Sequence, residues 1–114
     1  MDEAVARERL RAERDEVTGL LAGTEEAGRQ DRAAEDDTAA DIADPAQSLT
    51  AQGMDDAIAE SLRGRLAAID RALARLDEGG YGRSVRSGQP IPDERLEADP
   101  AAELTIEEAR ASGR

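Results

Sequence analysis

The sequence predicts a predominantly all-α fold, with a long antiparallel helical hairpin of the coiled-coil type over residues 1–79 and a small C-terminal module over residues 80–114. Two alanine-rich, highly charged stretches of nearly equal length favour the hairpin, because neither stretch can bury its narrow apolar face alone. The chain has 23 alanines and no phenylalanine or tryptophan. Alanine side chains are too small to fill a large globular core, but they suit helices that pack closely side by side.

The first arm is predicted as one helix from Asp2 to about Ala40, since this stretch is rich in alanine, glutamate and arginine and has no proline. Three glycines interrupt it, and each costs about 1 kcal/mol relative to alanine inside a helix. They indicate either a marginal, frayed helix or the close approach of a partner helix, and we favour a helix that depends on its partner. The arm's large apolar residues are few: Leu10, Val17, Leu20 and Leu21, with glycines at Gly19, Gly23 and Gly28.

The second arm has the strongest periodicity in the chain, with large apolar residues that step by three or four and predict a buried helical seam. Its start is indicated by Asp44 as N-cap, Pro45 at the first helical position and Gln47 as partner in a capping box. Gly79 and Gly80 are expected to end the helix. The predicted seam consists of Ile58, Leu62, Leu66, Ile69, Leu73 and Leu76.

The two arms are each roughly 35 residues long, or about 50 Å as helices. A short turn between residues 40 and 44 joins them, and equal arms with a tight turn predict antiparallel packing. Taken alone, Asp44 has the ordinary role of a helix N-cap and Asp41 that of an exposed loop carboxylate.

Composition excludes several kinds of function. The sequence has no cysteine, histidine or lysine, which removes disulfides, thiolate metal ligands and the usual general base. Its 15 arginines face 27 acidic residues, for a formal net charge of −12 that should repel nucleic acid. We therefore expect no enzyme and no direct, sequence-specific binding of DNA or RNA. Since no signal segment or long apolar run is present, we also expect a soluble, cytoplasmic protein with no membrane partner.

The C-terminal stretch has the glycines and prolines of a turn-rich module. A short helix is expected near Asp93–Ala98 and a last helix from Thr105, where Thr105 and Glu108 have the spacing of a capping box. The apolar residues expected to hold the module together are Tyr81, Val85, Ile91, Leu96, Leu104 and Ile106.

A family resemblance is found in this stretch. Residues 81–92 read YGRSVRSGQPIP, followed by RLEA at 95–98 and LTI at 104–106. This pattern is similar to the zinc-finger segment of the DksA/TraR family, whose four cysteine positions fall here on Ser84, Ser87, Thr105 and Glu108 with their spacing kept. Structural zinc sites use thiolate or imidazole, so we expect a zinc-finger-like module that binds no metal at these positions and needs no cofactor.

The turn carries the second part of the resemblance. DksA/TraR proteins have D-x-x-D-x-A at the tip of a helical hairpin, and this chain has Asp41, Asp44 and Ala46 in that pattern. The resemblance implies a bacterial transcription regulator that binds RNA polymerase and inserts this acidic tip into the secondary channel, so that it modulates promoter complexes. Some members respond to guanosine tetraphosphate through basic residues, but Asp99 and Ala109 stand at such positions here, so we expect weak or no binding of that nucleotide.

One alternative stays open from sequence. The chain could be an acidic helical hairpin with a structural or protein-interaction role, even a mimic of nucleic acid on a basic partner, without any action at the polymerase active site. The two hypotheses differ in whether Asp41 and Asp44 are needed for an effect on transcription.

Overall fold

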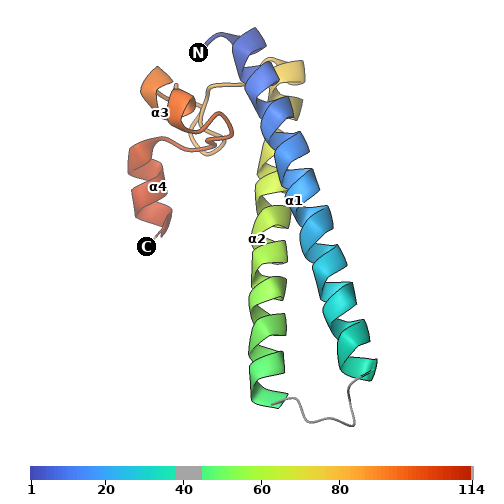
Figure 1. The fold of residues 1–114 in the computed structure, drawn as a ribbon. Helices are drawn as coiled ribbons and strands as arrows, with labels where there is room; N and C mark the ends of the chain where they lie inside the picture. The colour runs from blue at the N-terminus through green and yellow to red at the C-terminus, as the bar shows by residue number, and fades with distance from the viewer. Residues whose placement is uncertain (38–44, 114) are drawn as a thin grey trace. The chain divides into compact units, whose positions relative to one another are not determined.

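The computed structural model describes the backbone of residues 1–37 and 45–113, and the side chains of residues 1–24 and 53–112. It contains four helices in these ranges, α1 (Glu3–Asp37), α2 (Pro45–Glu78), α3 (Asp93–Ala98) and α4 (Ile106–Gly113), as Figure 1 shows. In the described part of the chain, β-structure is limited to one isolated antiparallel bridge between Arg83 and Pro90. The predicted all-α hairpin with a small C-terminal module is confirmed.

The chain divides into two compact units, and α1 and α2 contribute to both of them. The first unit contains Met1–Asp15 together with Ala67–Arg114, and the second contains Glu16–Leu66. In each unit the segment of α1 lies beside the antiparallel segment of α2 (Figure 1). The division into domains 1–79 and 80–114 remains a prediction.

In the first unit, small and large apolar side chains alternate between the two helices. Ala6 and Leu10 of α1 and Ile69 and Ala72 of α2 are fully buried, and Leu76 is 7% exposed. Alanines at these positions let the helix axes approach closely while leucine and isoleucine fill the space between them. Two ion pairs flank this seam, Arg7 with Asp77 and Arg14 with Asp70, each with a nitrogen–oxygen distance of 2.7 Å.

In the second unit the seam differs from the one predicted. Val17 and Ala59 are buried, whereas Ile58 is 49% exposed, so its assignment to the seam was wrong. Successive helical residues are about 100° apart, and the small Ala59 takes the inward position that the larger Ile58 was expected to fill. Leu20 and Met54 are also exposed, so large apolar residues in this unit are divided between the seam and the surface.

Gly19 and Gly23 of α1 do not mark close contact with another helix. A Cβ atom added at Gly19 or Gly23 would meet no neighbouring atom within 4 Å. Of the two alternatives drawn from sequence, the close approach of a partner helix is therefore wrong at these two positions, while Gly28 lies outside the described side chains. Gly19 and Gly23 therefore only lower the intrinsic helix stability of α1.

The ends of the long helices are set by local chemistry. Asp2 begins α1 as an N-cap, since its Oδ1 accepts hydrogen bonds from the amides of Ala4 at 2.7 Å and Val5 at 3.4 Å. The predicted stop of α2 is confirmed: Gly79 has a φ of 88°, and the amide of Gly80 donates to the carbonyl of Arg75 at 2.9 Å. This arrangement is the Schellman motif, for which glycine has the least strained backbone.

The core of the C-terminal module is smaller than predicted. Ile91, Leu96 and Ala102 form it, with Met1 and Tyr81 packed against it. Two residues expected in this core face solvent instead, Val85 at 57% and Ile106 at 38% exposed. Each follows a residue whose polar side chain is buried, Ser84 at 4% and Thr105 at 8% exposed.

The seam of the first unit can be tested with two isoleucines of α2. Ile69→Ala should lower the free energy of unfolding by about 2–5 kcal/mol, because a fully buried side chain leaves a cavity. Ile58→Ala is the matched control, and its cost should stay under about 1 kcal/mol because the side chain is already half exposed. Urea denaturation followed by circular dichroism measures both, and equal losses would contradict the assigned seam.

Candidate functional site

The sequence-predicted tip is only partly described by the structure. Asp41 and Asp44 lie outside the described residues, while Ala46 belongs to the first turn of α2, with its side chain outside them. The predicted start of α2 at Pro45 is confirmed. Residues 16–66 contain twelve acidic residues and four arginines, so this segment carries a formal net charge of −8 out of the −12 of the whole chain.

The four positions that correspond to the family's zinc ligands come together in the C-terminal module. The predicted capping box is confirmed: the amide of Thr105 donates to Oε1 of Glu108 at 2.9 Å, and the amide of Glu108 donates to Oγ1 of Thr105 at 3.2 Å. Hydrogen bonding from the Ser84 and Ser87 side chains is the leading cause of a lowered pKa at Glu108. One carboxylate therefore stands among the other three side chains.

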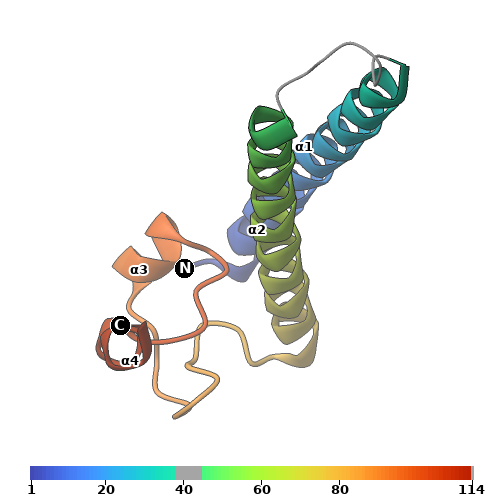
Figure 2. The same cartoon turned by 90° about the horizontal axis from the view of Figure 1, so that it is seen from below.

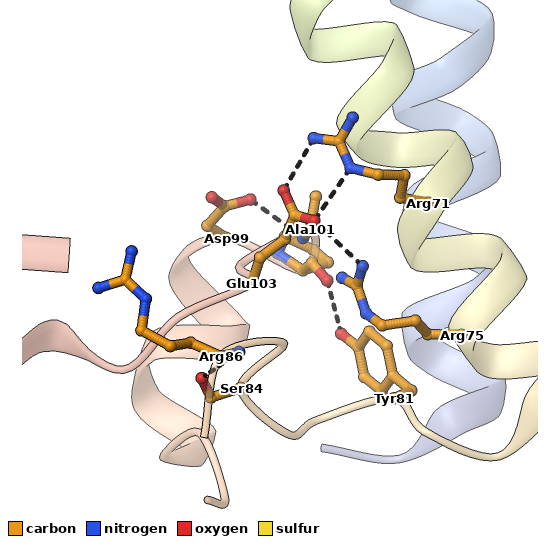
Figure 3. Close-up of polar contacts among 9 residues, drawn as sticks. Arg71, Arg75, Tyr81, Ser84, Arg86, Asp99, Ala101 and Glu103 are labelled. Atoms are coloured by element: carbon orange, nitrogen blue, oxygen red, sulfur yellow. Dashed lines mark hydrogen bonds and ion pairs between the residues drawn. The ribbon is translucent and has the colours of Figure 1, made fainter. Parts of the chain in front are cut away.

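Ser84 is fixed by its own turn. Its Oγ accepts hydrogen bonds from the amides of Arg86 at 3.1 Å and Ser87 at 3.2 Å, the first of which is drawn in Figure 3. Backbone bonds close the same turn, since the Ser84 amide donates to the carbonyl of Gln89 and the Gly88 amide donates to that of Ser84. With 4% of its surface exposed, Ser84 is a buried polar residue whose hydrogen bonds are made.

Hydrogen bonding sets the ionisation of Glu108. The Ser84 and Ser87 hydroxyls and the Thr105 amide stabilise the charged carboxylate and lower the pKa of Glu108 to about 2. The position of Glu108 at the start of α4 acts in the same direction, because the helix dipole favours negative charge there.

The donor set does not fit a structural zinc ion. Two serine hydroxyls, one threonine hydroxyl and one carboxylate lack the thiolate or imidazole groups that hold such an ion. Among the residues that the structure describes, no group of three or more His, Cys, Asp or Glu side chains is arranged to bind a metal. In the described part of the chain, no helix is both long and apolar enough to cross a membrane.

A second polar cluster in the same unit was not foreseen from sequence. Arg71 holds the Glu103 carboxylate with two bonds, from Nε at 3.0 Å and Nη2 at 2.8 Å, and Arg75 donates from Nη1 at 3.3 Å (Figure 3). Hydrogen bonding from Arg71 lowers the pKa of Glu103 and raises that of Arg71. The helical spacing of the two arginines was a visible signal, but nothing in the sequence pointed to Glu103 as their partner.

Tyr81 and Met1 both pack against the core of the module. The Tyr81 hydroxyl donates to the carbonyl of Pro100 at 2.8 Å, and burial raises the pKa of Tyr81. Met1 packs against the module core, and its amino group pairs with Asp93 at the start of α3, which Figure 2 shows beside the N-terminus. Sequence analysis gave Met1 no role, because its neighbour lies 92 residues away.

Comparison with known proteins gives a consistent set of relatives. The chain is 36% identical over 94 residues to the RNA polymerase-binding transcription factor DksA of Caulobacter vibrioides. This match covers 77% of this chain and 66% of that protein. It is 39% identical over 66 residues to general stress protein 16O of Bacillus subtilis, covering 58% of this chain and 40% of that protein. No family model matches.

A solved structure supports the same relationship. The structure of transcription factor DksA2 from Pseudomonas aeruginosa matches with a TM-score of 0.78 and 26% sequence identity, covering 96% of this chain and 81% of that chain. The curated relative from Caulobacter vibrioides is matched over just under two thirds of its own length.

The Arg71–Glu103–Arg75 cluster should stabilise the protein in a pH-dependent way. Glu103→Gln should cost about 1–3 kcal/mol at pH 7, because it removes the charge paired with the largely buried Arg75. The folded-state pKa of Glu103 lies below the ordinary 4.5, so its contribution is present above pH 4.5 and is lost as pH falls through the folded value.

Thermal melts of wild type and Glu103→Gln between pH 7 and pH 3 measure this dependence. The difference in melting temperature should shrink as the pH falls below 4.5. Glu97→Gln, at an exposed position of α3, is the matched control and should melt close to wild type at pH 7. A constant difference between wild type and Glu103→Gln would show that the ion pairs contribute nothing.

Proposed function

The chain belongs to the DksA/TraR family, and from this premise we propose that it is a transcription regulator that binds RNA polymerase. In this proposal the hairpin enters the secondary channel and its acidic tip acts near the active site, so that promoter complexes change without sequence-specific contact to DNA. RNA polymerase is the partner given in the name of the Caulobacter vibrioides relative. The match covers 66% of that protein, so the same partner is a proposal for this chain.

The observation that carries the proposal is the position of the D-x-x-D-x-A pattern. Asp41 and Asp44 stand between the end of α1 at Asp37 and the start of α2 at Pro45, with Ala46 in the first turn of α2. The pattern was noted in the sequence, and these helix boundaries support it independently. A motif that occurs by chance in an acidic chain would have no reason to fall at the one junction between two long helices.

Charge supports the same proposal. Between residues 17 and 60 the sequence has eleven acidic residues and two arginines. Such a segment is repelled by nucleic acid phosphates and attracted to basic protein surfaces and to bound cations. A regulator of this charge would bind a transcription complex through the polymerase and not through the DNA.

The remaining features agree with a regulator that is neither an enzyme nor a nucleotide receptor. Asp99 occupies a position where basic residues bind guanosine tetraphosphate in some relatives, and its Oδ1 accepts a hydrogen bond from the Ala101 amide at 3.0 Å. A carboxylate there disfavours a phosphate ligand, so we propose weak or no binding of that nucleotide. Binding to a bacterial RNA polymerase would also place the protein in the cytoplasm.

The tip can be tested with a charge-matched pair of double variants. Asp41→Asn with Asp44→Asn should reduce the effect on open promoter complexes by about tenfold, since a barrier change of about 1.4 kcal/mol has that effect. The asparagines keep helix-capping ability at position 44, so thermal stability should hardly change. Asp55→Asn with Asp56→Asn removes the same charge from α2 and should retain most of the effect.

Binding and action are then measured separately. Pull-down with core RNA polymerase reports binding, and crosslinking from position 42 reports whether the tip reaches the secondary channel. If wild type binds but both double variants alter transcription equally, the tip has no special role and the alternative of an acidic interaction module gains support. If wild type fails to bind the polymerase, the proposed function is wrong.

A further inference from the structure

The side of α2 that faces away from the helical seam is uncharged between residues 53 and 64. In this segment every charged residue lies within about 100° of the buried Ala59 around the helix. In a surface helix the charged residues ordinarily take the side opposite the core, so the usual arrangement is reversed here. The uncharged face consists of Gly53, Met54, Ala57, Ile58, Ser61 and Gly64, all of which are exposed.

Two large apolar side chains stand on this face. Met54 is 62% exposed and Ile58 is 49% exposed, and their spacing of four residues makes them neighbours on the helix surface. Together with Ala57 and Ser61 they have the i, i+3, i+4, i+7 spacing with which an amphipathic helix binds in an apolar groove. The small side chains at 57 and 61 allow a partner to approach α2 closely.

We propose that this face of α2 binds in an apolar groove of RNA polymerase that is bordered by basic side chains. The inference rests on the proposed function and adds a contact surface to the same hairpin. Met54 lies nine residues after the start of α2 at Pro45, or about 14 Å along the helix. A hairpin that enters a channel by its tip therefore brings this face against the channel wall.

Charge identifies the kind of partner. Residues 33–62 contain eight acidic residues and no basic one, so a partner surface with a basic border is complementary. Asp55, Asp56 and Glu60 supply the acidic side of these contacts, and the apolar centre supplies the buried area. A second copy of the chain is less suited to this face, because two such segments side by side would bring like charges together.

The double variant Met54→Gln with Ile58→Gln tests the face without a change of charge. Its dissociation constant for bacterial core RNA polymerase, measured on the full chain by biolayer interferometry, should rise about tenfold, because polar amides lose their hydration in an apolar groove. Glutamine is a good helix former and both positions are exposed, so the melting temperature should stay close to that of wild type.

Two control variants make the test specific. Val5→Gln replaces an apolar side chain of α1 that is 45% exposed in the first unit, and it should keep the wild-type affinity. Met54→Leu with Ile58→Leu keeps the face apolar at similar volume, so its affinity should also stay close to wild type.

Loss of affinity in the glutamine double variant alone supports the inference. A glutamine double variant that binds as wild type does, or a Val5→Gln variant that is weakened equally, would overturn the inference and leave the proposed function standing. If wild type does not bind the polymerase, the proposed function and this inference fail together.

Two further outcomes would also overturn the inference. A glutamine double variant that fails to fold, as judged by circular dichroism, would show that the face belongs to the core. Size-exclusion chromatography with light scattering identifies the other occupant: a wild-type dimer that the glutamine substitutions dissociate would assign the face to a second copy of the chain.

Discussion

The fold of the first unit depends on how a small C-terminal module without cysteine, histidine, phenylalanine or tryptophan is held together. Its apolar core is limited to Ile91, Leu96 and Ala102 with Tyr81 and Met1 packed against it. Such a core buries little area and contributes only a few kcal/mol. The Val85 amide, which donates to the Glu103 carbonyl at 2.9 Å, adds a backbone hydrogen bond between the 84–88 turn and the segment before α4.

The same unit joins the module to the hairpin by a second charged cluster. Arg71 and Arg75 of α2 hold Glu103, so the module is fixed to the helix by groups of opposite charge (Figure 3). Two of the guanidinium nitrogens of Arg75 are buried without a hydrogen-bond partner among the described residues. The remaining bond to Glu103 is therefore costly to lose, because it would leave a buried charge unpaired.

Local chemistry was predictable from sequence, and long-range placement was less so. The helix boundaries at Pro45 and Gly79 and the capping box of Thr105 and Glu108 depend on residues within a few positions of one another, and the structure confirms them. The exposure of Ile58, Val85 and Ile106 depends on which neighbour turns inward, and hydropathy alone does not decide that choice. The pairing of Arg71 with Glu103 spans 32 residues, so no local pattern reveals it, and the roles of Asp41 and Asp44 remain proposals.

The ionisation of Glu108 tests most directly whether this carboxylate is hydrogen-bonded at the family's former zinc-ligand positions. A carboxyl ¹³C NMR titration of the full chain, with Glu108 assigned, follows the side chain without any substitution. Hydrogen bonds from Ser84, Ser87 and Thr105 predict a midpoint at a pKa of about 2. A midpoint near 4.5, the ordinary value for glutamate, would contradict hydrogen bonding of the Glu108 carboxylate in the module.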